Sequence, residues 1–239
     1  MSEARRPAPF AAVAAPALVA LGCVLASAPA RAQVSGAVFT GGDFDQNDSG
    51  YLGAQIAAAK LRGGATVQVR AVATGGVYAY RRDGRMIDGW FVGAQVGPMM
   101  QWAGADGYFE AGVGARYVDT RLSPRDPQNR RRGGVFDALL SVDGQRRSAA
   151  WTATGYAEYG TGIEDYLVRA SVTRDVAPRW RVGPEVILQG DPTYDRQRGG
   201  VLFGWRRSAS SEIQFSVGGG RQSGRGGDAY GTVAFTHAF

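Results

Sequence analysis

Apolar and polar residues alternate with a period of two along most of the chain. Between Trp90 and Trp102, every second side chain is apolar, and an indole stands at each end of the stretch. Side chains of a β-strand point alternately to its two faces, so this pattern predicts a strand with one apolar face. The same alternation recurs over 107–121, 149–160, 164–174 and 179–189.

The positions of aromatic and charged residues within these strands distinguish a membrane barrel from a soluble sandwich. Aromatic residues fall at the ends of the apolar face, which is typical of the girdles of a lipid-facing barrel wall. A sandwich core would hold its aromatic residues in the middle of the strands. The opposite face carries charges mid-strand, as a polar lumen would. We expect the lumen charges to include Arg70, Glu110, Arg116, Glu158, Arg169, Arg181 and Glu185.

The fold class predicted from this pattern is all-β: a single up-and-down antiparallel transmembrane β-barrel of about twelve strands. An even number places both termini on the same side of the membrane. The expected strands are 34–44, 51–59, 65–80, 88–102, 107–121, 135–143, 149–160, 164–174, 179–189, 198–206, 211–218 and 228–239.

The connections between these strands fit that topology. With the termini in the periplasm, the longer connections should lie outside the cell. Outer connections are expected at 45–50, 123–134, 190–197 and 219–227, with short ones near 81–85 and 161–163. Inner connections are expected at 60–64, 103–106, 143–147 and 175–178.

The N-terminal residues 1–32 have the organisation of a cleavable signal peptide, which leaves 33–239 as one barrel domain. Arg5 and Arg6 precede an apolar stretch from Phe10 to Leu25, and Ala30-Arg31-Ala32 offers small residues for a signal peptidase. The apolar stretch is shorter than a membrane-spanning helix requires. A lipoprotein signal acylated at Cys23 is the alternative, although the residues before Cys23 match that pattern poorly.

Composition narrows the class further. The chain has 36 Gly without a three-residue period, which excludes collagen, and no apolar run after the signal is long enough for a membrane helix. The net charge of +6 is carried almost wholly by arginine, which suits contact with membrane lipid and lipopolysaccharide phosphates. The charge is too small and too dispersed to indicate nucleic acid, and export argues against it independently.

The C-terminus carries the most specific local signal. The last strand ends at Phe239, and apolar or aromatic residues recur two by two before it at Phe235 and Val233, although His237 interrupts the series. This resembles the signature that the barrel assembly machinery of the Gram-negative outer membrane recognises. The pattern therefore predicts an outer-membrane protein with that machinery as a partner.

Catalytic and metal-binding signals are weak. His237 is the only histidine and lies two residues from the end, where it is expected to face lipid near the rim, and no Gly-x-Ser-x-Gly elbow is present. The acidic stretch 43–50 fails the pattern of a calcium loop, and the mature chain has no Cys/His metal spacing. We expect no enzyme activity, no metal and no cofactor.

The stretch 123–134 is expected to form an exposed loop, which two prolines stiffen. Its run of three arginines, 130–132, is either a solvated surface or a docking point for lipopolysaccharide phosphates.

Several short stretches resemble the BcsS family of alphaproteobacterial cellulose biosynthesis proteins. They are Gly42-Asp43 with Ser49 and Tyr51, Leu122 to Asn129, and Val182 to Glu185 followed by Tyr194 and Arg198. The resemblance covers roughly 40–205 and implies an outer-membrane component that acts in export or surface handling of the polymer. It supplies no catalytic residues. Cellulose, or parts of the cellulose synthase complex, would then be partners.

The function expected from the sequence is a non-enzymatic barrel that supports cellulose biosynthesis, export or surface organisation. Two alternatives stay open: a general small porin or structural barrel, and a lipid-modifying enzyme that uses His237. Aromatic faces and carboxylates suit hydroxyl-rich ligands. The candidates for sugar contact are Tyr51, Asp126, Asn129, Tyr194 and Asp195.

Overall fold

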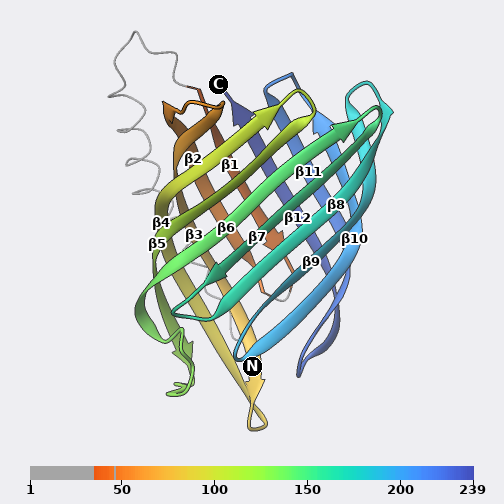
Figure 1. Ribbon diagram of the computed structural model, residues 1–239. Helices are drawn as coiled ribbons and strands as arrows, with labels where there is room; N and C mark the ends of the chain where they lie inside the picture. The colour runs from red at the N-terminus through yellow and green to blue at the C-terminus, as the bar shows by residue number, and fades with distance from the viewer. Residues whose placement is uncertain (1–34, 46) are drawn as a thin grey trace.

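The computed structural model describes residues 35–45 and 47–239, which form a closed antiparallel barrel of twelve strands (Figure 1). This confirms the predicted all-β barrel. The strands are β1 (Gly36–Phe44), β2 (Ser49–Lys60), β3 (Ala65–Arg82), β4 (Arg85–Gly104), β5 (Gly107–Ser123), β6 (Gly133–Ser148), β7 (Trp151–Gly160), β8 (Asp165–Ala177), β9 (Trp180–Asp191), β10 (Tyr194–Arg206), β11 (Ser211–Gln222) and β12 (Gly226–Ala238). The predicted signal peptide, 1–32, lies outside the described residues.

The barrel is closed by pairing of its first and last strands. β1 pairs with β12 from Ala37 opposite Ala238 to Phe44 opposite Gly231. The terminal residue extends this ladder, because Phe239 and Gly36 exchange two backbone hydrogen bonds of 2.9 Å. Each of the twelve described strands is therefore paired on both sides, so the backbone polar groups of the wall are satisfied within the sheet, as a hydrocarbon environment requires.

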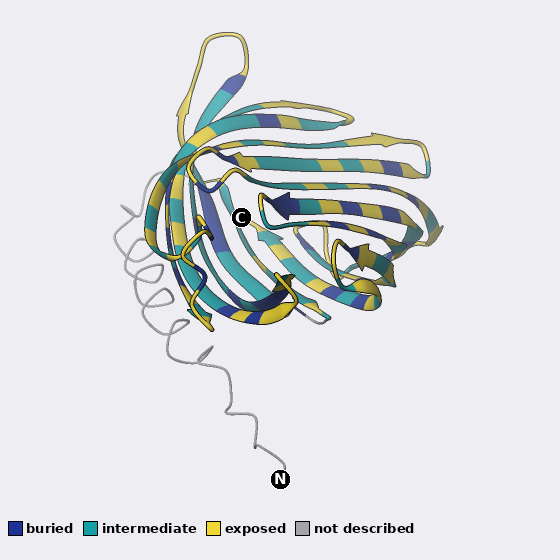
Figure 2. Ribbon diagram, turned by 90° about the horizontal axis from the view of Figure 1, so that it is seen from below, coloured by how far each residue is buried: buried dark blue, intermediate teal, exposed yellow. Residues whose placement is uncertain are grey.

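The two faces of the wall follow the alternation of the sequence, and burial therefore alternates along each strand (Figure 2). Large apolar side chains project outward and are exposed, among them Val96, Val113 and Leu140. Polar side chains of the intervening positions project into the lumen and are buried, among them Arg116 and Glu185. Apolar side chains outside and polar ones inside are the arrangement of a transmembrane barrel.

We call the end at which Gly36 meets Phe239 the termini end and the opposite one the loop end. The hairpin of β3 and β4 projects farthest at the loop end (Figure 1). These two strands have 18 and 20 residues, whereas about 9–11 suffice to cross a bilayer. No helix among the described residues is long and apolar enough to cross a membrane.

Several predicted connections were wrong in extent. β6 continues to Ser148, so 143–147 belongs to the strand and the turn is 149–150. The connections expected at 190–197 and 219–227 shrink to 192–193 and 223–225. In each case polar or glycine residues continue the alternation on the lumen face, and a strand whose lumen face is polar lacks the apolar contrast that sequence patterns rely on.

Glycine permits one unusually close approach of neighbouring strands. The ladder between β4 and β5 omits Gly97 and Pro98, since pairing jumps from Val96 to Met99. A Cβ atom at Gly97 would lie 2.1 Å from the backbone oxygen of Val113 and 2.5 Å from the Cα atom of Gly114. Any side chain at Gly97 would therefore force the two backbones apart.

We predict that Gly97→Ala lowers the free energy of unfolding by about 1–3 kcal/mol, through overpacking against the backbone of β5. Gly155→Ala is the matched control, because a Cβ atom there meets nothing within 4 Å. Urea titration in lipid vesicles, followed by the heat-modifiable band on gels, measures both variants. Equal stability of the two variants would contradict the close approach.

Candidate functional site

Paired charges line the lumen. The structure places all seven of the predicted lumen charges on inward-facing positions of the strands. Arg70, Arg116, Arg169 and Arg181 each form an ion pair with a carboxylate of another strand. Glu158 instead accepts a hydrogen bond from Tyr156, two residues away on the same strand.

A glutamine-rich group in the termini half of the lumen surrounds one carboxylate. Glu110, which is 3% exposed, accepts hydrogen bonds from Gln55 at 2.7 Å, Gln101 at 2.5 Å and Arg70 at 2.7 Å. Gln55 also donates to Gln68. The glutamines were missed in the sequence because an uncharged polar residue on a lumen face gives no signal of its partner.

A second group of contacts, around Glu185 and Arg169, includes hydrogen bonds to a strand that is not a neighbour of either residue's strand. The carboxylate of Glu185 on β9 pairs with Arg169 on β8 at 2.5 Å and accepts a hydrogen bond from Tyr230 on β12 at 3.5 Å. Arg169 also donates to Thr232 on β12 at 3.5 Å. The two hydrogen bonds to β12 connect positions three and four strands apart around the wall and therefore pass through the lumen.

Towards the loop end, two nearly inaccessible arginines share the carboxylate of Asp45. Arg196 lies 2.9 Å from Asp45 and also pairs with Asp228. Arg198 lies 3.3 Å from Asp45. Breaking a buried pair by removing one partner is costly, because it leaves a charge in a low-dielectric site. This group therefore holds β10, β12 and the β1–β2 connection in one arrangement.

The connection 124–132 between β5 and β6 turns inward across the loop end of the barrel. Arg131, with a side chain 14% exposed, pairs with Asp191 at 2.6 Å and with Asp165 at 2.9 Å. These carboxylates belong to β9 and β8, and Asp165 also pairs with Arg116 at 2.5 Å. The expectation of a wholly solvated loop was wrong for Arg131, because two lumen carboxylates offered it a counter-charge.

A second attachment fixes the first half of the same connection. Tyr80 donates a hydrogen bond of 2.6 Å to the carboxylate of Asp126, and Asn129 donates one of 2.8 Å to the hydroxyl of Tyr80. Arg82 pairs with Asp126 at 3.2 Å. Burial opposes the charge of Asp126, but the hydrogen bonds and Arg82 lower the pKa of its carboxyl below the ordinary 3.8. Asp126 and Asn129 are each 4% exposed.

The five sugar-contact candidates do not form one surface. Asp126 and Asn129 hold the 124–132 connection in place. Tyr194 points inward near the loop end, and Tyr51 points into the lumen from β2. Asp195 lies on the outer side, where its carboxylate accepts a hydrogen bond of 2.8 Å from half-buried Tyr166. Only Asp195 among the five is exposed.

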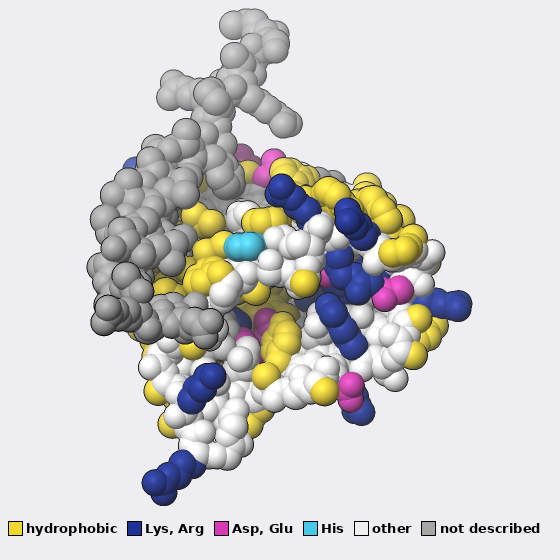
Figure 3. Space-filling model, turned by 90° about the horizontal axis from the view of Figure 1, so that it is seen from above, with side chains coloured by type: hydrophobic (Ala, Val, Ile, Leu, Met, Phe, Trp, Pro, Cys, Tyr) yellow, Lys and Arg dark blue, Asp and Glu magenta, His cyan; other side chains and the backbone are white. Residues whose placement is uncertain are grey.

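His237 faces outward at the termini end, where it is visible in Figure 3. Its Nδ1 atom lies 2.7 Å from the hydroxyl of Ser211 on the neighbouring strand. Among the described residues, no carboxylate is hydrogen-bonded to the imidazole, so the acid of a catalytic triad is not supplied there. Val233, Phe235 and Phe239, the residues of the predicted assembly signal, project to the same outer side as His237.

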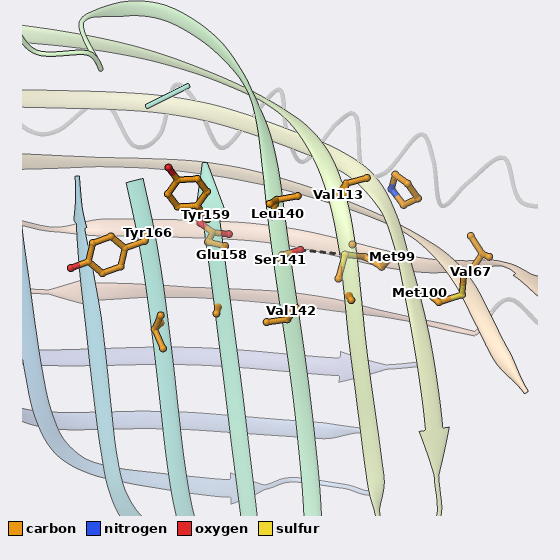
Figure 4. Close-up of a pocket in the computed structure, with 15 residues that line it drawn as sticks. Val67, Met99, Met100, Val113, Leu140, Ser141, Val142, Glu158, Tyr159 and Tyr166 are labelled. Atoms are coloured by element: carbon orange, nitrogen blue, oxygen red, sulfur yellow. Dashed lines mark hydrogen bonds between the residues drawn. The ribbon is translucent and has the colours of Figure 1, made fainter. Parts of the chain in front are cut away.

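A shallow groove crosses the outer wall over β3 to β8 (Figure 4). Small residues on its floor, Pro98, Ala111 and Ala157, are bordered by larger ones such as Leu140 and Tyr159. The lining is apolar apart from Ser141 and Glu158. It therefore presents hydrocarbon-compatible surface and no constellation for chemistry. No group of acidic, His or Cys side chains in the described part of the chain could hold a metal ion.

Known structures with this architecture are outer-membrane barrels. The KdgM porin has a TM-score of 0.50 at 8% identity, over 85% of this chain and 99% of that one. The translocator domain of the autotransporter NalP from Neisseria meningitidis has a TM-score of 0.52 at 11% identity, over 96% of each chain. The beta domain of the Bordetella autotransporter Brka has a TM-score of 0.51 at 13% identity, over 86% of this chain and 99% of that one. The class is thus a twelve-stranded barrel of the outer-membrane type.

The family follows from a sequence comparison. Residues 37–239 match the family model of the cellulose biosynthesis protein BcsS, and the chain belongs to that family. No curated protein matches the chain. The family assignment associates the barrel with cellulose biosynthesis, and the barrel fold supports a location in the outer membrane.

We predict that removal of the Arg131 side chain loosens the loop end. Arg131→Ala leaves Asp191 without its counter-ion in a largely buried place, although Asp165 keeps Arg116, and should cost about 3 kcal/mol. Arg130→Ala is the neighbouring control, since Arg130 pairs with Glu164 at the surface and its side chain is 54% exposed. That variant should change stability by less than about 0.5 kcal/mol. Urea titration in vesicles measures both, and equal effects would contradict the inward attachment.

We predict that acid releases the 124–132 connection. The Asp126 carboxylate binds Tyr80 and Arg82, so its pKa is lower in the attached than in the released state. Attachment is therefore fully favoured above about pH 4 and is lost as the pH falls through the lowered pKa.

A spin label at Arg125→Cys, an exposed position next to Asp126, should become mobile only below about pH 4, and Asp126→Ala should make it mobile at every pH. A label at Ala209→Cys, in the β10–β11 turn, is the control and should not respond. A rigid Arg125 label in the Asp126→Ala protein would contradict the attachment.

Proposed function

We propose that this barrel is a non-catalytic outer-membrane component of cellulose production, which holds the polymer or its machinery at the membrane and is not itself the polymer's conduit. The observation that carries this proposal is the inward attachment of the 124–132 connection by Arg131 to Asp165 and Asp191. Below it, further ion pairs and hydrogen bonds pass through the lumen. A glucan chain would have to displace both.

The surface for sugar contact would then lie on the outside of the loop end. Tyr166 and Asp195 present an aromatic ring and a carboxylate next to each other, which suits a hydroxyl-rich ligand. Tyr194, the preceding residue, lies on the inner side of the same turn between β9 and β10. Tyr51 is the deeper candidate, which a sugar would reach only through the lumen.

A conductance measurement separates an anchor from a porin. We predict that the purified protein in planar bilayers shows little steady conductance, because charged side chains and the 124–132 connection obstruct the lumen. The Arg131→Ala variant should show conducting events more often, whereas the conductance of the Arg130→Ala variant should match that of the unaltered chain. A steady large conductance that cello-oligosaccharides block would overturn the anchor and favour passage of glucan fragments.

Complementation tests the non-catalytic part of the proposal and the lipid-modifying alternative together. In a strain that lacks the gene, His237→Ala and Ser211→Ala should restore surface cellulose as fully as the unaltered chain. Asp195→Ala should reduce polymer retention at the surface without reducing the amount of folded barrel. Loss of function in both His237→Ala and Ser211→Ala, with heat-modifiable protein at normal levels, would favour an enzyme.

A further inference from the structure

We propose that one arc of the termini end binds the headgroups of anionic phospholipids. The arc spans three successive turns of the rim, between β6 and β7, β8 and β9, and β10 and β11. Figure 3 shows that lysine and arginine side chains gather mainly on one side of this end. Four of the exposed arginines in or beside the turns define what we call the arginine arc: Arg146, Arg174, Arg179 and Arg207.

The arginine arc has little counter-charge within the protein. None of its four side chains forms an ion pair with any described residue, although the lumen arginines are paired. Asp175, on the same stretch of rim, is already paired with Arg206 at 2.5 Å. Asp106 lies on the adjoining turn, next to the backbone of Arg147. The arc therefore keeps a net positive charge that an external anion can neutralise.

Tryptophans place the arginine arc at the level of lipid headgroups. Trp151, Trp180 and Trp205 project from the outer wall near the same three turns, and the rings of Trp180 and Trp205 stack with centroids 6.1 Å apart. Outward tryptophans on a membrane barrel mark the interface between hydrocarbon and water. The guanidinium of Arg174 lies 5.8 Å from the ring of Trp151, its partner across the strands.

The orientation of these side chains favours lipid over a protein that approaches along the barrel axis. Arg174 projects outward with Trp151, and Arg146 lies on the outward face of β6 opposite Ala153. A guanidinium binds phosphate through two parallel hydrogen bonds. In outer-membrane barrels the end with the short turns faces the periplasm, so the lipid at this level is phospholipid of the inner leaflet. The partner is therefore a phosphate-bearing lipid with net negative charge, such as phosphatidylglycerol.

The test uses the tryptophans of the arc as reporters. Trp90→Phe and Trp102→Phe leave the three arc tryptophans as the only indoles, since the chain has five. The protein is placed in phosphatidylethanolamine bilayers with a minor fraction of phosphatidylglycerol, and one lipid at a time carries brominated acyl chains that quench fluorescence. We expect phosphatidylglycerol to be enriched about fivefold beside the arc, which corresponds to a binding free energy of about 1 kcal/mol.

Two quadruple variants decide the outcome. Replacing the arginine arc with glutamine should abolish the enrichment. The same change at Arg81, Arg85, Arg125 and Arg132, all exposed at the loop end, should leave it intact at the same net charge. High salt should weaken the enrichment through screening. Quenching in proportion to lipid content in the unaltered chain, or enrichment that survives in the arc variant, would overturn the proposal.

If the arc quadruple variant gives no heat-modifiable barrel, Arg146→Gln and Arg174→Gln are measured singly. Each single variant should then remove part of the fivefold enrichment, and no reduction in either would also overturn the proposal. The proposal rests on the barrel fold and not on the role in cellulose production, so its failure and the failure of that role are separate results.

Discussion

Pairing between β1 and β12 is the constraint on which the rest of the structure depends. In a hydrocarbon environment each unpaired backbone group is costly, so a sheet can cross only when it has no open edge. Gly36 and Phe239 complete the closure at the termini end, where their backbones exchange two hydrogen bonds. Once the sheet is closed, every strand has one face in lipid and one in the lumen. The period of two in the sequence is the consequence of that geometry.

Closure of the barrel then restricts which side chains can face the lumen. A barrel of twelve strands is too narrow for its polar residues to be fully hydrated and too wide for small residues to fill. The chain meets this with arginine, carboxylate and glutamine side chains that bind one another, as around Glu110 and Asp45. The 124–132 connection joins the same network through Arg131. The connection therefore turns inward because lumen carboxylates bind Arg131, and not because of the conformational preferences of its own residues.

The two ends of the barrel differ in what they present. The loop end has the projecting hairpin of β3 and β4, the inward connection and the outward Tyr166–Asp195 pair, all suited to contact outside the membrane. The termini end has short turns with unpaired arginines above outward tryptophans, suited to anionic headgroups. Both arrangements are compatible with a barrel whose lumen serves stability while its ends meet polymer and lipid. An anchor needs this combination, whereas a conduit would need an unobstructed axis.

The sequence by itself determined the class, because alternation, aromatic residues at strand ends and the terminal Phe239 are local consequences of lying in a barrel wall. It also placed the lumen charges on the inward face, since that requires only parity along a strand. Only the tertiary structure decided their partners. The contact of Arg131 with Asp191, or of Tyr80 with Asp126, joins residues that are 60 and 46 positions apart. The same holds for the arginine arc, whose members come from three separate turns that adjoin only because the sheet curves and closes. Spacing along a chain fixes which face a side chain occupies, whereas strand tilt and curvature fix what it meets there.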